Sequence, residues 1–354
     1  MQTNRITKKI LNWYSQSKRQ LPFRCTKDPY KIWISEIMLQ QTQVSTVIPF
    51  YEKWINKFPT LQSVAKSKSD ILLKSWEGLG YYRRCDNFHK ACKIIVENHN
   101  GVIPSDYDTL KSLPGVGDYT AGAVLSIAFG KGISAIDGNV TRVISRLYGI
   151  KNLTIFNKLK IKNYVLSLIP PSNPGDFNQS LMELGALICS PRNPTCRTCP
   201  ISFNCKAFHS TYPDQYPKKV KKKSIPHYNV VIAIIWRKNK FYIQKRNIES
   251  MLGGLWEFPG GKVKKNESLK KALKRELKEE VNFTPKIKKK IISVNHSYSH
   301  FSITMHCYYC IEFESKIIPK DPSKWISNNE IDKYSFPKAN HKIFNFLNEN
   351  SWDL

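Results

Sequence analysis

The sequence predicts two domains, an all-α domain followed by an α/β domain. Up to about residue 208 the apolar residues recur at helical intervals, for example at Val47 and Tyr51. After residue 227 the pattern changes to short apolar runs separated by turn residues, which is typical of strands. Residues 209–227 combine prolines and a lysine run with no periodicity, as linkers do. The predicted domains are therefore 1–208 and 228–354.

The second domain is expected to contain strands on both sides of one helix. Asn229–Trp236 and Phe241–Arg246 are predicted to form a hairpin, and Ile291–Asn295 and Ile303–Phe313 are further strands. Glu267–Glu280 is polar and rich in helix-favouring residues, so a helix is expected between the two groups of strands. No internal repeat is visible.

The charge of the chain favours a polyanionic partner. Its 354 residues include 56 Lys plus Arg and 27 Asp plus Glu, a formal net charge of +29 that is spread along the sequence. Nucleic acid is the leading candidate, because lysine and arginine contacts to phosphates give salt-sensitive affinity without sequence readout. An AT-rich genome, whose codons favour lysine, is the alternative explanation for part of this excess.

The sequence argues against secretion and against membrane insertion. The first ten residues contain no apolar stretch of signal-peptide length, and the longest apolar run, Val230–Trp236, is only strand length. An intracellular protein is expected, and its nine cysteines are not expected to form disulfides. Five of them show no ligand spacing and are expected to be small buried residues: Cys25, Cys85, Cys92, Cys307 and Cys310.

The other four cysteines fall within the loop 189–205, separated by six, two and five residues. Four thiolates at such spacing indicate a metal site. Structural zinc usually joins two Cys-x-x-Cys pairs across a longer loop, whereas one pair flanked by single cysteines favours a [4Fe-4S] cluster. Zinc remains the alternative. The expected ligands are Cys189, Cys196, Cys199 and Cys205.

A glycine-rich turn and a carboxylate mark the centre of the first domain. Leu113-Pro-Gly115-Val116-Gly117 lies between two helical segments, where its backbone N–H groups could bind a DNA phosphate. About twenty residues later, Asp137 precedes a helical segment. A helix N-cap is an ordinary use of such an aspartate, and it is compatible with a functional role.

These motifs together resemble the helix-hairpin-helix DNA glycosylase superfamily. The segments Ile34-Ser-Glu36-Ile-Met-Leu39-Gln-Gln41 and Gly78-Leu-Gly-Tyr81-Tyr-Arg are similar to motifs of the MutY-type adenine DNA glycosylases. The resemblance covers nearly the whole chain. It implies an all-α glycosylase domain with a [4Fe-4S] loop, followed by a Nudix-like α/β domain.

The resemblance implies that Glu36 is the general acid that protonates adenine N7. Its neighbours on a helix, Ile32, Trp33, Leu39 and Gln40, are mostly apolar, so desolvation is expected to raise its pKa toward neutrality. A glutamate paired with one of the many basic groups is the alternative.

Asp137 is expected to stabilise the oxocarbenium-like sugar once adenine is protonated, electrostatically or as a transient nucleophile. By resemblance, Tyr119 and Asn139 orient Asp137 or the attacking water. Bifunctional members of the superfamily carry a lysine where this chain has Tyr119. Because a phenol cannot form a Schiff base, base removal without efficient strand cleavage is expected.

Further residues are assigned by the resemblance alone. Arg24, Leu39 and Gln179 match positions that line the adenine pocket, and Gln41 and Tyr81 match positions that enter the base stack when adenine is flipped out. For Tyr81 and Leu39, ordinary core packing is the alternative.

A nearly complete Nudix box runs from Gly260 to Phe283. Glu276, Glu279 and Glu280 fall on one face of a helix and could bind Mg²⁺. Only Asn282 departs from the box, standing where glycine is usual. The family's Nudix-like domain recognises 8-oxoguanine; residual pyrophosphohydrolase activity and a solvated acidic helix face both remain open.

The segment Tyr298-Ser299-His300 resembles the family's 8-oxoguanine-sensing loop, although ordinary hairpin residues would look similar. The expected function is removal of adenine paired with 8-oxoguanine or guanine in double-stranded DNA. The protein is expected to be a bacterial, cytoplasmic, nucleoid-associated monomer with no membrane partner. A noncatalytic mismatch-binding protein and a Nudix nucleotide hydrolase are the alternatives.

Overall fold

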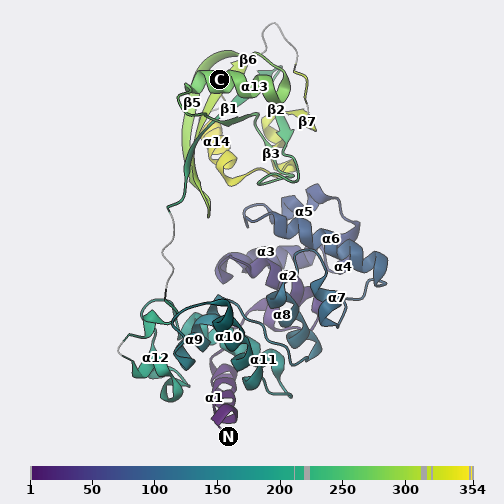
Figure 1. The fold of residues 1–354 in the computed structure, drawn as a ribbon. Helices are drawn as coiled ribbons and strands as arrows, with labels where there is room; N and C mark the ends of the chain where they lie inside the picture. The colour runs from purple at the N-terminus through teal and green to yellow at the C-terminus, as the bar shows by residue number, and fades with distance from the viewer. Residues whose placement is uncertain are drawn as a thin grey trace. The chain divides into compact units, whose positions relative to one another are not determined.

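The computed structural model describes residues 2–210, 212–218, 224–311, 317–319, 322–350 and 352. Its contacts divide the chain into two compact units (Figure 1). The helical unit comprises Met1–Ser67 and Asn87–Lys221, and the mixed unit comprises Lys68–Asp86 and Lys222–Leu354. The mixed unit thus takes in a short segment from the first third of the chain. The boundaries predicted from sequence follow chain order and do not include this exchange.

Helices make up the first part of the chain, as predicted. They are α1 (Gln2–Ser17), α2 (Pro29–Leu39), α3 (Val44–Lys57), α4 (Leu61–Lys66), α5 (Ser69–Trp76), α6 (Arg83–Asn98), α7 (Tyr107–Lys111), α8 (Asp118–Phe129), α9 (Gly138–Tyr148), α10 (Ile155–Leu168), α11 (Pro174–Leu187) and α12 (Lys206–His209). A 3₁₀ turn, η1, covers Pro22–Arg24. Within this set, α5 belongs to the mixed unit, and α6 begins there and continues into the helical unit.

Close packing around α8 and α11 positions the centre of the helical unit. A Cβ atom at Gly122 of α8 would lie 2.2 Å from the backbone oxygen of Ser134, so only glycine permits this approach. Gly175 of α11 meets the backbone of Ser126 in the same way, at 2.7 Å. The amide of Asn178 then ties the loop segment 133–135 to α8 through three hydrogen bonds. The loop that leads to Asp137 is therefore fixed from two sides.

The mixed unit contains a seven-stranded sheet. The strands are β1 (His227–Arg237), β2 (Lys240–Lys245), β3 (Trp256–Glu257), β4 (Gly260–Lys262), β5 (Lys286–Ser297), β6 (Ser302–Ile311) and β7 (Ser323–Ile326). The main order is β3-β2-β1-β6-β5; β4 pairs with β1, β7 pairs with β2, and β1 and β6 run parallel.

Helices cover both faces of this sheet. Val231, Ala233 and Ile235 of β1 pack with buried residues of α13 (Leu269–Val281), and the alternate residues Ile232 and Ile234 pack with α14 (Lys338–Glu349). This alternation follows from the period of two along a strand. The predicted α/β class is confirmed, whereas the second covering helix, α14, was not predicted.

Two differences from the predicted strands have a physical reason. Strand β5 begins at Lys286, five residues before the predicted strand 291–295. Its first residues are mostly lysines, which hid the strand pattern. Charged side chains are common on an edge strand such as β5, because they discourage pairing with another chain. The short strands β3, β4 and β7 were not predicted, since they carry too few residues for a visible alternation. Part of the predicted strand Ile303–Phe313, residues 312 and 313, lies outside the described residues.

The predicted linker is partly folded. Its described part contains a 3₁₀ turn at Pro213–Gln215, and the Lys218 N–H donates to the Lys151 carbonyl at 2.6 Å. The lysine run of the linker, residues 219–223, lies outside the described residues. In the described part of the chain, no helix is long and apolar enough to cross a membrane.

Candidate active site

A cavity of about 670 Å³ in the helical unit brings most of the predicted catalytic and pocket residues together. Its walls come from η1, α2, the starts of α8 and α9, and α11. The predicted residues that line it are Arg24, Glu36, Leu39, Gln41, Tyr119, Asp137, Asn139 and Gln179. These residues come from five separate segments of the chain, so the fold creates the cavity.

Glu36 lies in the middle of α2 and is 7% exposed. The helix begins at Pro29, where the Asp28 carboxylate accepts from two backbone N–H groups. Burial raises the pKa of Glu36 to about 7, the Tyr119 hydroxyl lowers it, and Asp137 raises it further. Near neutral pH this carboxyl group can therefore hold a proton and give it up, and the expected rise of its pKa is found.

Tyr119 lies in the first turn of α8, and its hydroxyl donates to Oε2 of Glu36 at 2.5 Å. The same oxygen lies 3.6 Å from Sδ of Met182. Burial and the neighbouring carboxylates raise the pKa of Tyr119 well above its ordinary value, so the phenol stays protonated. By resemblance Tyr119 is expected to orient Asp137 or water, whereas its side-chain hydrogen bonds go to Glu36 and Met182.

Asp137 is the N-cap of α9 and also faces the cavity. Its Oδ1 accepts from the Val140 N–H and its Oδ2 accepts from Nδ2 of Asn139, both at 2.7 Å. Burial raises the pKa of Asp137, while these two hydrogen bonds lower it. The carboxylate thus has a fixed orientation, and the predicted N-cap is confirmed while the same side chain faces the cavity.

Glu183 of α11 also lines the cavity and was not predicted from the sequence. Its fully buried carboxylate accepts from Nη2 of Arg24 at 2.7 Å and from Nε and Nη2 of Arg19 at 2.8 and 2.7 Å. Burial opposes ionisation, but these hydrogen bonds lower its pKa to about 2. The spacing could have indicated that Glu183 lines the cavity, because it follows the predicted pocket residue Gln179 by one helical turn.

The ion pair with Glu183 leaves one nitrogen of Arg24 for other use. Nη1 of Arg24 is buried and has no hydrogen-bond partner among the described residues. Arg24 also lies over the Tyr14 ring, with its guanidinium carbon 5.8 Å from the ring centre. A planar guanidinium held in this way can donate to a polar ligand in the cavity.

The four cysteines of loop 189–205 border one small cavity together with Arg146 and Phe208. Nη1 of Arg146 lies 3.3 Å from the Cys189 sulfur and donates to the Ser190 carbonyl at 2.7 Å. Within the described residues, no three His, Cys, Asp or Glu side chains converge closely enough to hold a single metal ion. The thiols therefore surround a space without meeting at a point.

A chain of hydrogen bonds joins this loop to the catalytic cavity. Nε of Arg142 donates to the Cys189 carbonyl at 2.7 Å, and Nη2 donates to Oδ1 of Asn139 at 2.8 Å. Asn139 in turn donates to Asp137. Arg142 therefore links the backbone of a predicted cluster ligand to the residue that orients the carboxylate.

Comparisons with known proteins agree with this arrangement. Residues 34–171 match the model of the HhH-GPD superfamily of base excision DNA repair proteins, and residues 230–346 match a NUDIX domain model. An adenine DNA glycosylase of Buchnera aphidicola from Schizaphis graminum is 41% identical, covering 83% of this chain and 84% of its own. The chain belongs to the adenine DNA glycosylase family.

Other relatives extend the comparison. The Homo sapiens adenine DNA glycosylase is 31% identical, over 95% of this chain and 72% of its own. A solved thermostable thymine-DNA glycosylase covers 59% of this chain and 97% of its own, with 29% identity and a TM-score of 0.55. The prediction of a base excision repair enzyme with a helical domain and a Nudix-like domain is confirmed, which removes the noncatalytic alternative.

In this adenine DNA glycosylase the predicted DNA-binding hairpin lies between α7 and α8. Gly115 has φ +78°, a left-handed conformation that favours glycine, and a Cβ atom there would lie 2.9 Å from Cβ of Asn87. Val116 is buried, whereas Gly115 and Gly117 are exposed. Gly117 is the N-cap of α8 and has no side-chain cap, so the first turn can present N–H groups to an anion.

The two residues predicted to enter the base stack both have strained backbones. Gln41 has φ +57° and Tyr81 has φ +49°, in a region that non-glycine residues seldom adopt. Gln41 borders the catalytic cavity of the helical unit. Tyr81 lies in the mixed unit, after Gly78 and Gly80, which also have positive φ angles.

The predicted 8-oxoguanine loop is the turn between β5 and β6. The Tyr298 N–H donates to the Phe301 carbonyl at 2.8 Å, and the two rings stack with centres 4.7 Å apart. Ser299 and His300 are exposed at the tip. The Ser299 hydroxyl is hydrogen-bonded to the hydroxyl of Tyr81, so the structure joins two predicted contact residues within the mixed unit.

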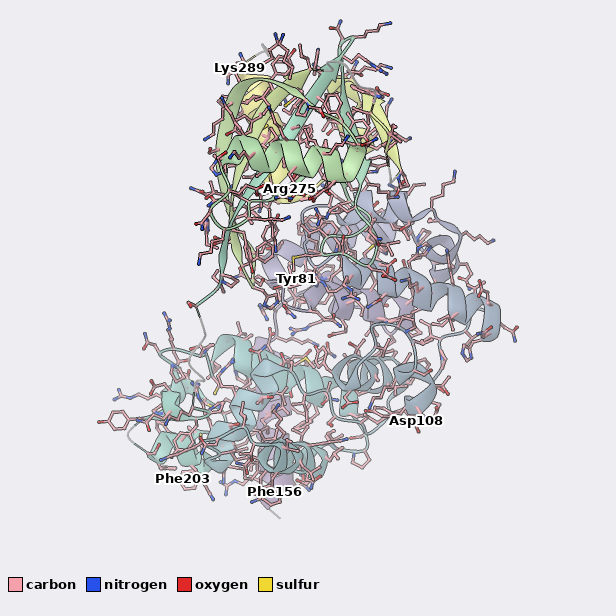
Figure 2. The ribbon with its side chains drawn as sticks, turned by 45° about the horizontal axis from the view of Figure 1, so that its top comes forward. Tyr81, Asp108, Phe156, Phe203, Arg275 and Lys289 are labelled. Atoms are coloured by element: carbon pink, nitrogen blue, oxygen red, sulfur yellow. The ribbon has the colours of Figure 1, made fainter. Side chains whose placement is uncertain are left out.

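The glutamates of the Nudix helix α13 are engaged by protein groups. Arg275, labelled in Figure 2, donates to Glu267 at 2.8 Å, to Glu276 at 2.7 Å and to Glu279 at 3.2 Å. Glu280 accepts from the Gly260 N–H at 2.9 Å and from Gln244 at 2.8 Å. Asn282 adopts the left-handed conformation that its place in the box requires, with φ +47°.

Proposed function

We propose that this adenine DNA glycosylase removes adenine that stands opposite 8-oxoguanine or guanine in double-stranded DNA. The observation that carries the proposal is the pair of buried carboxyl groups on one cavity, Glu36 with a pKa near 7 and Asp137 with a fixed orientation. The cavity volume suits a purine base that has left the helix.

The two carboxyl groups divide the work. Protonated Glu36 donates to adenine N7, which makes the base a better leaving group. Ionised Asp137 then stabilises the positive charge that develops on the sugar, and water completes the hydrolysis. Tyr119 tunes Glu36, Asn139 orients Asp137, and Arg24, Leu39 and Gln179 hold the base.

Strand cleavage is not expected to accompany base removal. None of the described residues that line the cavity is a lysine, and Tyr119 stands at the lysine position of the bifunctional relatives. Lyase chemistry requires an amine that can form a Schiff base with the sugar. The product is therefore an intact strand with an abasic site.

A [4Fe-4S] cluster is proposed on Cys189, Cys196, Cys199 and Cys205. Four thiols around one cavity, with the Arg146 cation beside a sulfur, fit a cubane of negative charge better than a single zinc ion. When bound, the cluster supplies order to the loop and need not change its oxidation state. Arg192, Arg197 and Lys206 are exposed on or beside this loop and offer cations to DNA phosphates.

The remaining DNA contacts are proposed from the family resemblance, and the exposed glycine turn and the β5–β6 turn support them. Gly115, Val116 and Gly117 are proposed to bind a phosphate. Gln41 and Tyr81 are proposed to fill the space that the flipped adenine leaves, and Tyr298, Ser299 and His300 are proposed to read 8-oxoguanine. We infer a monomer that acts on DNA in the bacterial cytoplasm. The proposed domain limits are 1–208 for the glycosylase domain, 209–227 for the linker and 228–354 for the Nudix-like domain.

Nucleotide hydrolysis by the Nudix helix is less well supported. Glu276 and Glu279, which a Mg²⁺ ion would require together with Glu280, are engaged by Arg275. Incubating the protein with nucleoside triphosphates and Mg²⁺ tests this alternative, and steady pyrophosphate release would support it.

Single-turnover assays with and without alkali test the proposed function. Duplexes with adenine opposite 8-oxoguanine should break at the adenine only after alkali. Replacing Glu36 with glutamine should slow the reaction by about 10²- to 10⁴-fold, the range for loss of a general acid. Tight binding of the mismatch by cluster-loaded protein without any breaks would contradict the proposal.

A further inference from the structure

A short segment of the chain, Lys68–Asp86, belongs to the mixed unit although it lies far from the other residues of that unit in sequence. Both of its ends continue directly into the helical unit, at Ser67 and at Asn87. The segment contains α5 and the turn that carries Tyr81. Whatever fastens it to the sheet therefore fixes Tyr81 with respect to the sheet.

Glu77, the C-cap residue that follows α5, makes the central contact. Its Oε1 accepts from the Phe336 N–H at 2.7 Å and from Nε2 of His341 at 2.9 Å. Its Oε2 accepts from Nζ of Lys74 at 2.5 Å, and this ammonium also donates to the Tyr334 carbonyl at 3.0 Å. One carboxylate thus collects three donors from α5, from the chain before α14 and from α14 itself.

The partners of Glu77 are part of the sheet domain's core. The Phe336 side chain is fully buried in the cluster beneath the sheet, and the neighbouring Ser335 carbonyl accepts from the Trp256 N–H of β3 at 2.8 Å. Burial alone would raise the pKa of Glu77, but the hydrogen bonds from His341, Lys74 and the Phe336 amide lower it. The carboxylate is therefore ionised and bound to a rigid support near neutral pH.

A second contact lies close to the first along the segment. Only Gly78, Leu79 and Gly80 separate Glu77 from Tyr81, whose hydroxyl bonds that of Ser299. A further pair joins Asp70 at the start of α5 to Lys245 of β2. The side chain of Glu77 is 13% exposed, whereas the Tyr81–Ser299 and Asp70–Lys245 pairs are more exposed. Glu77 is thus the best shielded of these polar contacts.

We propose that Glu77, held by His341 and the Phe336 amide, is a positioning residue that determines which base opposite adenine is accepted. It fixes the distance between the Tyr81 ring and the Ser299–His300 tip, so that both contact the same base pair. The inference rests on the proposed function and assigns its substrate preference to a residue outside the catalytic cavity.

Loss of Glu77 should reduce preference and leave the chemistry intact. Without this carboxylate, the segment is held to the sheet by more exposed polar contacts such as Tyr81–Ser299 and Asp70–Lys245, which are weaker because water competes for their polar groups. Glu36 and Asp137 belong to the helical unit and not to this segment, so adenine opposite guanine should leave at nearly the same rate. Adenine opposite 8-oxoguanine should leave about tenfold more slowly, as expected for losing one charge-assisted hydrogen bond.

The test compares single-turnover adenine removal opposite 8-oxoguanine and opposite guanine. Glu77→Ala should lower the ratio of the two rates about tenfold, in line with that lost bond. Glu77→Gln should lower it less, because its amide oxygen can still accept from the Phe336 N–H while its NH₂ group faces the donor of Lys74. A double-mutant cycle with His341→Ala should be non-additive, since both changes remove the same bond.

Glu249→Gln is the matched control, an exposed charge removal in the same unit that should leave the ratio unchanged. Equal slowing of both rates by Glu77→Ala, or an unchanged ratio, would overturn the inference. Binding to duplexes with 8-oxoguanine or guanine opposite an abasic site measures the same preference without chemistry. If the intact protein prefers 8-oxoguanine over guanine in binding but removes no adenine, only the proposed function is contradicted. If Glu77→Ala leaves this binding preference unchanged, the inference is overturned.

Discussion

The hydroxyl of Tyr119 lies 2.5 Å from Oε2 of Glu36 and is the donor in that hydrogen bond. Two opposing effects therefore meet on one carboxyl group: burial raises its pKa, and the phenol lowers it by stabilising the charged form. The balance of about 7 puts the group in the range where a general acid works best at physiological pH. Tyr119 thus sets how readily Glu36 gives up its proton.

Replacing Tyr119 with phenylalanine should raise the pKa of Glu36 further, because the opposing hydrogen bond is lost. The alkaline limb of the single-turnover rate against pH should move to higher pH. The measurement is the rate of adenine removal between pH 5 and pH 9. Tyr107→Phe is the control, since its phenol donates to Asp118 outside the cavity. An alkaline limb that moved to lower pH would refute this role for Tyr119.

Replacing Glu36 with glutamine should stabilise the folded protein above neutral pH. The pKa of Glu36 in the folded protein, about 7, exceeds the ordinary value of 4.5, so the folded state favours the protonated form. The stability that Glu36 contributes is therefore fully present below pH 4.5 and is lost as the pH rises through about 7. Between these two pH values, the free energy of unfolding of the variant should rise above that of the intact protein, by roughly 3 kcal/mol at the upper end.

Chemical unfolding at pH 5 and at pH 8 measures this difference in the free energy of unfolding. Glu52→Gln, on the exposed side of α3, controls for loss of a negative charge. The glutamine variant should be more stable and much less active at pH 8. Equal stability of the variant and intact protein at both pH values would mean that burial does not strain this carboxylate.

Replacing Arg142 with glutamine should slow adenine removal without loss of the cluster. The Arg142 side chain donates to the carbonyls of Cys189 and Gly185 and to the side chain of Asn139. Because Asn139 orients Asp137, a small misplacement of this carboxylate should cost roughly a hundredfold in rate. Iron content and visible absorption should match intact protein. Arg5→Gln, an exposed change on α1, is the control; a variant that lost iron in proportion to its activity would contradict a positioning role.

The sequence was sufficient to predict those parts of the site that depend on local order. Apolar neighbours of Glu36 predicted its raised pKa, and Asp137 before a helical segment predicted its cap. Pairs formed by the tertiary fold could not be predicted in this way. Arg24 and Glu183 are 159 positions apart, and the sequence around either residue does not indicate that the two form an ion pair. The membership of Lys68–Asp86 in the mixed unit was likewise hidden, because boundaries read along the chain cannot exchange segments in space.

Arg84 should control the entry of Tyr81 into DNA. Its Nη2 donates to the Gly80 carbonyl at 3.1 Å and to the Leu79 carbonyl at 3.4 Å, and its guanidinium carbon lies 5.3 Å from the centre of the Tyr81 ring. A planar fork that grips the turn and supports the ring can hold the unfavourable φ angle of Tyr81. Lysine keeps the charge but cannot make these contacts together.

Arg84→Lys should therefore slow base flipping more than it weakens binding. A fluorescent adenine analogue beside the target base would report unstacking, which should be about tenfold slower if the wedge is displaced, and adenine removal should slow equally. Arg83→Lys, at the exposed neighbouring position, is the matched control and should leave both rates unchanged. A phosphate contact affects salt-dependent affinity, whereas a positioning contact affects the flipping step after DNA is bound. If Arg84→Lys only weakened binding in a salt-dependent way, Arg84 would therefore be a phosphate contact.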